Sequence, residues 1–413
     1  MFNLLKKIES RLFVSKNHIF FAKNRLKLAA PFFSFGMNQY DLLAMAEFNL
    51  DLKIDPQMPV RKDWRIGTIG AGAIIRGCHQ VAYKQAGFNS YAIASLNRSR
   101  AEEVAREFNI PVVHNSWQEL LKDKQVEIVD IAVPPDKQLE IVREAVKEKD
   151  HIKGILCQKP LAMNLAEANE IVLLCEHSGI KLSVNSNMRY DQSIRALKTL
   201  LDHQYFGKII LATIDMRAIP HWQEFLKKYD RIEMLNMGIH HIDTFRYLFG
   251  DPEKVTAITR SDPRTTFPHI DGITQYTFKY ADDMIATSLD DVWAWQGEGT
   301  QKDMYIRWRV EGLDGMAQGE IGWPKFPAKG LSTIRFTTRK FPDQWIEPAW
   351  DTVWFPDAFQ GTMASLLRAV ENDTLPEING RDNLHTMATI DALYLSIKEE
   401  RTVRLTETLK NVK

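Results

Sequence analysis

The sequence predicts an α/β protein in which a doubly wound parallel sheet is followed by an α+β domain with a large open antiparallel sheet. In the first part, short apolar runs rich in β-formers alternate with helical patterns of roughly 10 to 15 residues, as in parallel sheets. After residue 189, longer strands with alternating apolar and polar residues follow one another with few helices between them, which favours an antiparallel sheet.

The parallel part is assigned to residues 63–188. Its strands are expected at 64–70, 91–95, 126–133, 154–157 and 181–184. Ser116 with Glu119, and Asn164 with Glu167, have the spacing of capping boxes, so each pair marks the start of a helix between these strands.

Residues 189–413 are assigned to the α+β domain, which is expected to carry the substrate site and the subunit contacts. Strands are expected at 208–216, 254–260, 271–280, 284–292 and 332–338, and closing helices at 359–370 and 384–398. Residues 1–62 form an N-terminal extension that is basic and amphipathic up to residue 36. Three interpretations stay open for it, none with assigned chemistry: an untranslated stretch before a start at Met37, a surface helix, or a targeting tail.

Composition excludes several classes of protein. The 413 residues include 53 basic and 53 acidic side chains, and 45% are hydrophobic, which excludes a disordered chain or a fibre. Zero net charge argues against general nucleic-acid binding, since phosphate contacts need a basic excess. No apolar run approaches the roughly 20 residues that span a bilayer, so no membrane insertion is expected. The scattered Cys78, Cys157 and Cys175 suit reduced thiols in the cytoplasm.

A glycine-rich segment, Gly67-x-x-Gly70-x-Gly72, lies between the first expected strand and the following helix. A tight turn there lets the backbone approach a pyrophosphate at a helix N-terminus, as in dinucleotide sites. Ile75 replaces the usual third glycine, and a purely structural turn stays open as the alternative. Cofactor contacts are expected here from Gly70, Gly72, Ala73 and Ile74.

The end of the second strand distinguishes NAD from NADP in this fold. The segment Ser95-Leu96-Asn97-Arg98 has no acid to bind a ribose 2′-hydroxyl. Arg98 is compatible with a 2′-phosphate or with a solvated arginine at a helix start. NAD or NADP is therefore expected, with contacts from Ser95, Asn97 and Arg98.

Three segments together resemble the Gfo/Idh/MocA family of NAD(P)-dependent sugar and polyol oxidoreductases: Gly70-Ala71-Gly72, Gln158-Lys159-Pro160, and the stretch from Gly238 to Asp243. The similarity covers most of the chain. It implies a Rossmann domain joined to a large open sheet. It also implies hydride transfer between a nicotinamide and a secondary carbinol of a sugar, cyclitol or glycoside.

In that family the lysine of a Glu-Lys-Pro motif corresponds to Lys159, and the catalytic histidine to His240. Three positions depart from the pattern. Gln158 replaces the glutamate before the lysine, Asn236 replaces an acid four residues before the histidine, and Gln138 replaces a histidine after the third strand. The first two changes remove negative charge but keep hydrogen-bonding capacity through the amides, which bears on the pH optimum and the substrate.

Oxidation of a carbinol moves a hydride from carbon to the nicotinamide and a proton from oxygen to a base. His240 is expected to accept the proton, since histidine titrates near neutral pH. Asp243 shares its helical face and is expected either to orient the ring or to pair locally. Lys159 is expected to donate to the substrate hydroxyl and stabilise the alkoxide, with Asn236 as a third catalytic residue.

The remaining candidate contacts surround these residues. Further cofactor contacts are expected from Pro134, Gln158 and Lys159. Substrate contacts are expected from Arg189, Tyr190, His221, His241 and Asp243. Seven of the ten tryptophans lie between residues 293 and 354, where packing and subunit contacts are the main expectation and stacking on a sugar is the alternative.

Two other activities stay open. Some relatives oxidise a sugar transiently and cleave a glycoside by elimination, with NAD bound and recycled. Others bind a dinucleotide as non-catalytic sensors, and the retained Lys159 and His240 argue against that. A homodimer or homotetramer is expected through the open sheet, and no metal.

Overall fold

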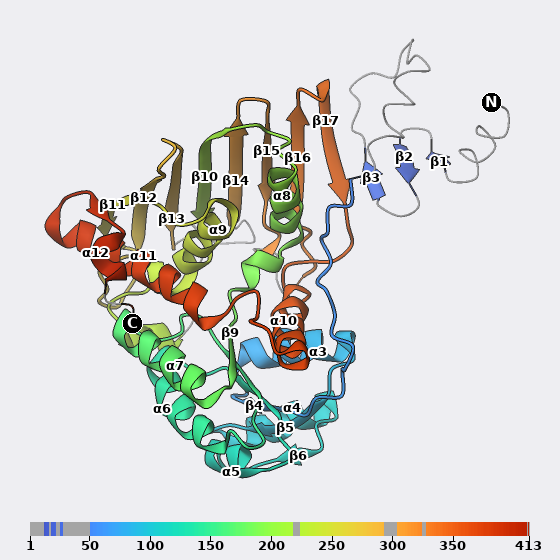
Figure 1. Cartoon of the computed structure of the whole chain (residues 1–413), viewed down its shortest axis with the longest axis vertical. Coiled ribbons are helices and arrows are strands. Elements are labelled where there is room, and N and C mark those ends of the chain that lie inside the picture. Colours follow the sequence, from blue (N-terminus) through green and yellow to red (C-terminus); the bar gives the residue numbers. More distant parts are fainter. Residues whose placement is uncertain are drawn as a thin grey trace.

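The computed structural model describes the backbone of residues 12–15, 18–21 and 25–27. It also describes residues 50–217, 224–292, 304–323, 328–410 and 412 with their side chains. Two large sheets are joined by a layer of helices (Figure 1). The first part of the chain builds the parallel sheet and the second part builds the larger one, which confirms the predicted architecture.

Six parallel strands form the first sheet, in the order β6-β5-β4-β7-β8-β9. Their bounds are β4 Ile66–Ile69, β5 Ser90–Ala94, β6 Val112–Val113, β7 Ile128–Ile131, β8 Gly154–Cys157 and β9 Lys181–Val184. Strands β4, β7 and β8 are buried throughout, which explains their apolar runs. All five predicted strands are present, and β6 is an extra edge strand. The chain reverses its direction of strand addition between β4 and β7, where doubly wound folds bind ligands.

Helices alternate with these strands. They are η1 Ile75–His79 with α3 Gln80–Ala86, α4 Arg98–Phe108, α5 Trp117–Lys122, α6 Pro135–Ala145 with η2 Val146–Glu148, and α7 Leu165–Ser178. The expected N-caps are confirmed. The side chain of Ser116 accepts a hydrogen bond from the main-chain N–H of Glu119, and that of Asn164 accepts one from the main-chain N–H of Glu167. The segment η1 has π-helical geometry, which is frequent at functional sites.

The larger sheet has ten strands in the order β18-β11-β12-β13-β10-β14-β15-β16-β17-β3. Their bounds are β3 Arg25–Lys27, β10 Ile209–Arg217, β11 Lys254–Arg260, β12 Ile273–Lys279, β13 Ile285–Asp291, β14 Tyr305–Gly312, β15 Gly315–Glu320, β16 Thr333–Thr338, β17 Phe341–Ala349 and β18 Val403–Arg404. The predicted large antiparallel sheet is confirmed with one exception, because the neighbours β10 and β13 are parallel. The chain leaves β10, passes through α9 and returns by the meander β11-β12-β13, and such a long connection allows parallel neighbours.

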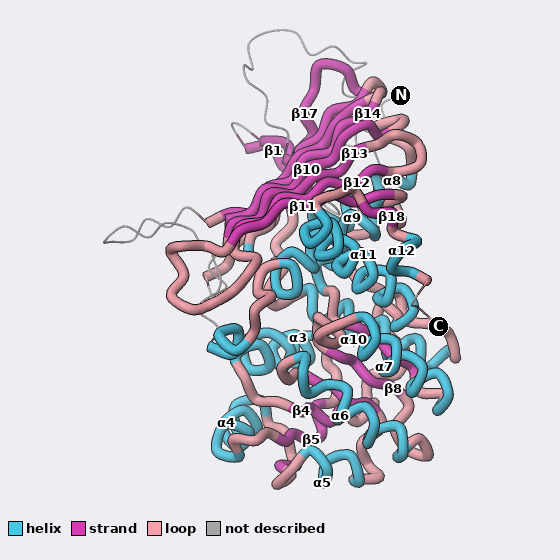
Figure 2. The backbone as a smooth tube through the Cα atoms, turned by 90° about the vertical axis from the view of Figure 1, so that its left-hand side faces the viewer, coloured by secondary structure: helices cyan, strands magenta, loops and turns pink. Residues whose placement is uncertain are grey.

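Helices separate the two sheets (Figures 1 and 2). They include η3 Asn187–Tyr190, α8 Gln192–Asp202, η6 Met234–Gly238, α9 Ile239–Phe249 and α11 Gly380–Glu399. Helix α10 (Ala358–Asn372) follows the larger sheet in sequence but packs on β8, β9 and α3 of the parallel part. Gly154 permits this contact, because a Cβ there would lie 3.0 Å from Val370 and 3.1 Å from Leu366. The two parts therefore share a core.

Three short elements complete the fold: η5 Glu224–Lys228, α12 Thr406–Leu409, and the pair formed by β1 Leu12–Ser15 and β2 His18–Phe21. Within the N-terminal extension, residues 12–15, 18–21 and 25–27 form strands, not the surface helix considered above, and residues 50–62 form neither strand nor helix. Strand β3 pairs with β17. No helix in the described part of the chain is long and apolar enough to cross a bilayer. The described residues also contain no group of three acidic, histidine or cysteine side chains arranged to hold a metal ion.

Candidate active site

Lys159 lies in the loop of residues 158–161, the lysine loop, which follows β8 at the carboxyl edge of the parallel sheet. Its Nζ donates a hydrogen bond to the main-chain carbonyl of Asn236 over 2.5 Å. Asn236 belongs to η6, a second π-helical segment, directly before α9. This bond brings together two of the three predicted catalytic residues and joins the two parts of the protein.

Burial changes the acidity of Lys159. Removal from water disfavours the charged ammonium and lowers the pKa of Lys159 from 10.5 to about 7. A lysine with this pKa exchanges protons near neutral pH, as a general acid or base must.

His240, in the first turn of α9, is 3% exposed. Burial lowers its pKa well below 6.5, and the charges of Lys159 and His241 lower the pKa further. The ring is therefore neutral and stands edge-on to Trp354, with ring centroids 5.3 Å apart. Nδ1 of His240 and Nδ2 of Asn236 are buried without a hydrogen-bond partner among the described residues. Such unsatisfied polar atoms are groups that a bound hydroxyl compound would satisfy.

The glycine turn after β4 fits a dinucleotide. Gly70 has a φ of +120°, and a Cβ there would lie 2.4 Å from the carbonyl oxygen of Ala132 at the end of β7. A Cβ at Gly72 would meet no described atom within 4 Å, so that side of the turn is open. Ala73, exposed, and Ile74, half-buried, then begin the helix. A helix N-terminus behind an open glycine can receive a pyrophosphate, so these residues fit the expected cofactor.

The carboxyl end of β5 carries polar groups but no acid in the position that reads a ribose. The side chain of Asn97 caps α4. The hydroxyl of Ser95 accepts a hydrogen bond from the main-chain N–H of Asn97 over 3.3 Å. Arg98 donates to Glu102 over 2.8 Å and to Asn115. This end of the strand fits either NAD or NADP.

Gln138 supports the lysine loop from α6, the helix that begins after Pro134. The side chain is fully buried, and its Nε2 lies 2.9, 2.8 and 3.2 Å from three main-chain carbonyl oxygens of the loop. This departure from the family pattern therefore has a structural role in fixing the backbone beside Lys159.

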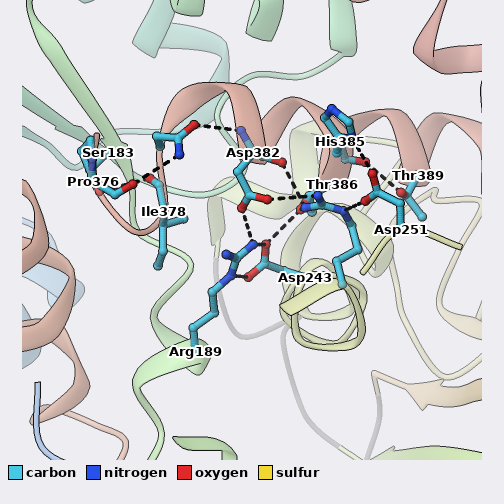
Figure 3. A network of polar contacts seen from close by, with 12 residues as sticks. Ser183, Arg189, Asp243, Asp251, Pro376, Ile378, Asp382, His385, Thr386 and Thr389 are labelled. Carbon is cyan, nitrogen blue, oxygen red and sulfur yellow. Dashed lines mark hydrogen bonds and ion pairs between the residues drawn. The ribbon is translucent and has the colours of Figure 1, made fainter. Parts of the chain in front are cut away.

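Arg189 and Asp243, two expected substrate contacts, are bonded to each other (Figure 3). Two bonds of 2.7 Å join the guanidinium to the carboxylate, and both side chains are buried. Asp382 of α11 accepts a further bond from Arg189, and Thr386 donates to Asp243. Burial would lower the pKa of Arg189, but the two carboxylates outweigh it and raise that pKa. The network links η3, α9 and α11. Asp243 therefore forms an ion pair inside the fold, which is the local pairing expected as one of its two roles.

The other expected substrate contacts also have partners inside the fold. The hydroxyl of Tyr190 donates to Glu377 over 2.9 Å. His241 Nδ1 lies 2.9 Å from Asp290, with both side chains fully buried. His221 lies outside the described residues.

Two of the late tryptophans are buried and hydrogen-bonded. Trp308 donates to Ser193 over 3.3 Å, and Trp354 donates to Asn187 over 3.0 Å. These contacts favour the packing interpretation for both. Trp293 and Trp295 lie outside the described residues.

Comparison with known families decides the identity of the chain. Residues 64–186 match the model described as "Oxidoreductase family, NAD-binding Rossmann fold", and residues 194–318 match the GFO/IDH/MocA C-terminal domain. The chain belongs to the Gfo/Idh/MocA family. The two matches together cover more than half of its residues and confirm the expected resemblance, the oxidoreductase class and the nicotinamide cofactor.

Curated relatives of this Gfo/Idh/MocA protein include sugar dehydrogenases. A D-apiose dehydrogenase of Paraburkholderia graminis is 26% identical over 367 residues, which span 83% of this chain and 90% of the relative. A D-xylose 1-dehydrogenase (NADP(+)) of Haloferax volcanii is 23% identical over 320 residues, which span 76% of this chain and 91% of the relative.

Solved structures show the same fold. An oxidoreductase from Agrobacterium radiobacter in complex with NAD+, L-tartaric acid and magnesium matches with a TM-score of 0.72 and 22% identity, over 84% of this chain and 100% of that one. A levoglucosan dehydrogenase in complex with NADH and levoglucosan matches with a TM-score of 0.71 and 17% identity, over 83% of this chain and 99% of that one.

Sequence reasoning missed His79, which lies beneath the lysine loop of this Gfo/Idh/MocA member. His79 is 1% exposed and contacts Gln158, the residue before Lys159. The signal available was its position seven residues after Gly72, two turns into the first helix, on the face that packs against the sheet.

Proposed function

We propose that this oxidoreductase transfers a hydride between NAD or NADP and a secondary hydroxyl of a sugar or cyclitol. The observation that carries the proposal is the hydrogen bond from Lys159, at the carboxyl edge of the sheet, to Asn236, four residues before His240 in sequence. Strands β4 and β8 are separated only by β7, so the glycine turn and Lys159 lie on one edge about 10 Å apart. The named substrates of the relatives, D-apiose and D-xylose, support the substrate class.

Residues of the glycine turn after β4 and of the segment after β5 would hold the cofactor. Gly70, Gly72 and Ala73 would receive the pyrophosphate, and Ser95 and Asn97 would face the ribose. When bound, the nicotinamide supplies the acceptor or donor of the hydride.

The proton roles follow from the pKa values. The amine of Lys159, with a pKa of about 7, is the better match for accepting the hydroxyl proton during oxidation. His240, whose pKa is held well below 6.5, acts as a neutral hydrogen-bonding group beside it. This assignment exchanges the roles expected from the sequence. Asn236 contributes its free amide to a substrate hydroxyl.

The proposal includes an assembly and a compartment. A second copy would pack on the outer face of the ten-stranded sheet, which no described helix covers, to give a homodimer or homotetramer (Figure 2). The three cysteines, all free and buried, support a cytoplasmic location.

One experiment tests the function in two steps. Thermal unfolding with NAD, NADH, NADP and NADPH identifies the cofactor, because a ligand at about 100 times its Kd stabilises by about 2.7 kcal/mol. A panel of aldoses, polyols and cyclitols is then assayed with that cofactor, alongside Lys159→Met. Turnover by the native protein and its loss by orders of magnitude in the variant support the proposal. Cleavage of a chromogenic glycoside without cofactor consumption would support the elimination reaction, and binding without any reaction would support a sensor.

A further inference from the structure

A buried polar chain runs beneath the lysine loop, from the centre of the parallel sheet to Gln158. Asp130, in β7, lies 2.8 Å from Nδ1 of His79, and each side chain is 1% exposed. On the other side of the ring, Nε2 of His79 lies 2.9 Å from Nε2 of Gln158 and 3.1 Å from Nδ2 of Asn185. This series of buried hydrogen bonds therefore ends at Gln158, the residue next to Lys159.

The hydrogen-bond inventory fixes the proton on this histidine. The Oε1 atom of Gln158 accepts the main-chain N–H of Lys159 over 3.1 Å, which orients the Gln158 amide with its NH₂ toward His79. An amide NH₂ only donates, so Nε2 of His79 must be the acceptor and carries no hydrogen. The hydrogen is then on Nδ1 and is donated to Asp130.

This arrangement suits a glutamine in place of the family's glutamate before the lysine. A carboxylate at position 158 would only accept, so it would need a hydrogen on His79 Nε2 and therefore a protonated ring beside Asp130. The amide of Gln158 matches the neutral ring and also accepts the Lys159 N–H.

Burying this series of hydrogen-bonded polar side chains costs folding free energy that apolar packing would not. Asp130 occupies the middle of a fully buried parallel strand, where apolar residues are usual, and it also accepts a bond from Tyr83 over 2.9 Å. Replacement of a buried polar pair by apolar side chains of similar volume is often neutral or stabilising. A role in the site accounts for its presence better than stability does.

We infer that His79, oriented by Asp130, is a positioning residue that acts through Gln158 to hold Lys159 against Asn236. Gln138 fixes the carbonyls of the lysine loop from one side, and His79 fixes the side chain of Gln158 from the other. The inference rests on the proposed function of Lys159.

Three variants separate positioning from packing. His79→Asn keeps an amide near the Nδ1 position to bond Asp130 but leaves Gln158 without its acceptor. His79→Gln reaches the Nε2 position and restores that acceptor. Gln80→Met is the matched control, because Gln80 is the next residue, is equally buried and bonds only Thr68 among described side chains.

The expected result is a split between turnover and binding, measured with whichever sugar of the panel the native protein oxidises. His79→Asn lowers kcat by about tenfold to a hundredfold. Its KM and its cofactor-induced thermal shift stay within about twofold of the native values. His79→Gln recovers most of kcat, and Gln80→Met keeps native kcat. Equal kcat for His79→Asn and His79→Gln, or a loss of kcat that only follows loss of folded protein, would overturn the inference.

A second readout needs no turnover. The apoprotein is treated with formaldehyde and a borane reductant, and methylation of Lys159 is followed by peptide mass spectrometry against exposed Lys153. His79→Asn is expected to accelerate Lys159 methylation by about threefold or more, since its loop is no longer held, while Gln80→Met leaves the rate unchanged. An unchanged rate in His79→Asn contradicts the inference. If no sugar is turned over but the rates differ, the proposed function fails and the positioning stands.

Discussion

The ammonium of Lys159 and the main-chain carbonyl of Asn236 are joined by a 2.5 Å hydrogen bond that crosses between the two parts of the chain. One partner follows a strand of the parallel sheet, and the other lies in a π-helical turn packed below the larger sheet. The position of Lys159 is thus set by one part of the chain, and the positions of Asn236 and His240 by the other. Relative placement of the two parts determines whether the site forms.

The pH dependence of alcohol oxidation should follow Lys159. Its pKa of about 7 predicts that kcat/KM rises about tenfold per pH unit below neutrality and levels off above it, because only the neutral amine accepts a proton. Initial rates with saturating cofactor across this range measure the profile. A rate that falls as pH rises through 7 would show that the ammonium is the active form and would return proton acceptance to His240.

Stability should depend on pH for the same reason. Between pH 7 and 10.5, folded Lys159 has released a proton that the unfolded chain still holds, so the free energy of unfolding rises with pH in this window. Below pH 7 the charged, half-buried ammonium opposes folding in full. Lys159→Met removes this group, so its advantage over the native protein in urea unfolding should shrink by about 2 kcal/mol between about pH 6 and about pH 9.

Lys153→Met provides the control for that measurement, because Lys153 is exposed and directly precedes β8, the strand that Lys159 follows. Its difference from the native protein should be the same at both pH values. A pH-independent difference for Lys159→Met would mean that the ammonium is not desolvated.

Two glycines of one turn should respond differently to alanine. Gly70→Ala forces a residue into a φ of +120° and against the Ala132 carbonyl, so it should destabilise the protein by about 1–3 kcal/mol or more. Gly72→Ala meets open space and should leave the unfolding free energy nearly unchanged, while it weakens the thermal shift produced by the cofactor. Full cofactor stabilisation of Gly72→Ala would place the pyrophosphate elsewhere.

The strands that the sequence predicts best are those that are buried on both faces. Strands β4, β7 and β8 are enclosed on both faces and are mostly apolar, with Thr68 and Asp130 as the polar exceptions. Strand β15 has no such signal, because it contains Gly315 and Gly319, and a side chain at Gly319 would collide with the Thr333 carbonyl at 2.1 Å. Strand β17 is interrupted by Pro342 and Pro348, which suit its position near the sheet edge.

The site was only partly predictable for a different reason. Lys159, Asn236 and His240 belong to motifs, and the structure brings Lys159 and Asn236 into contact. Arg189 and Asp243 are residue types that bind sugars, but they are 54 positions apart and bond each other in the fold. Sequence pattern does not distinguish a substrate clamp from a buried ion pair, because both use the same guanidinium and carboxylate.

That ion pair supplies the last prediction. Arg189→Met leaves the carboxylates of Asp243 and Asp382 close together without their shared guanidinium, so it should destabilise the protein by about 3–5 kcal/mol. Arg189→Lys keeps the charge but loses the bidentate contact. Its free energy of unfolding should lie between that of Arg189→Met and that of the native protein. Urea unfolding measures both. A substrate role would instead appear as a raised KM with native stability, and that outcome would return Arg189 to the binding site.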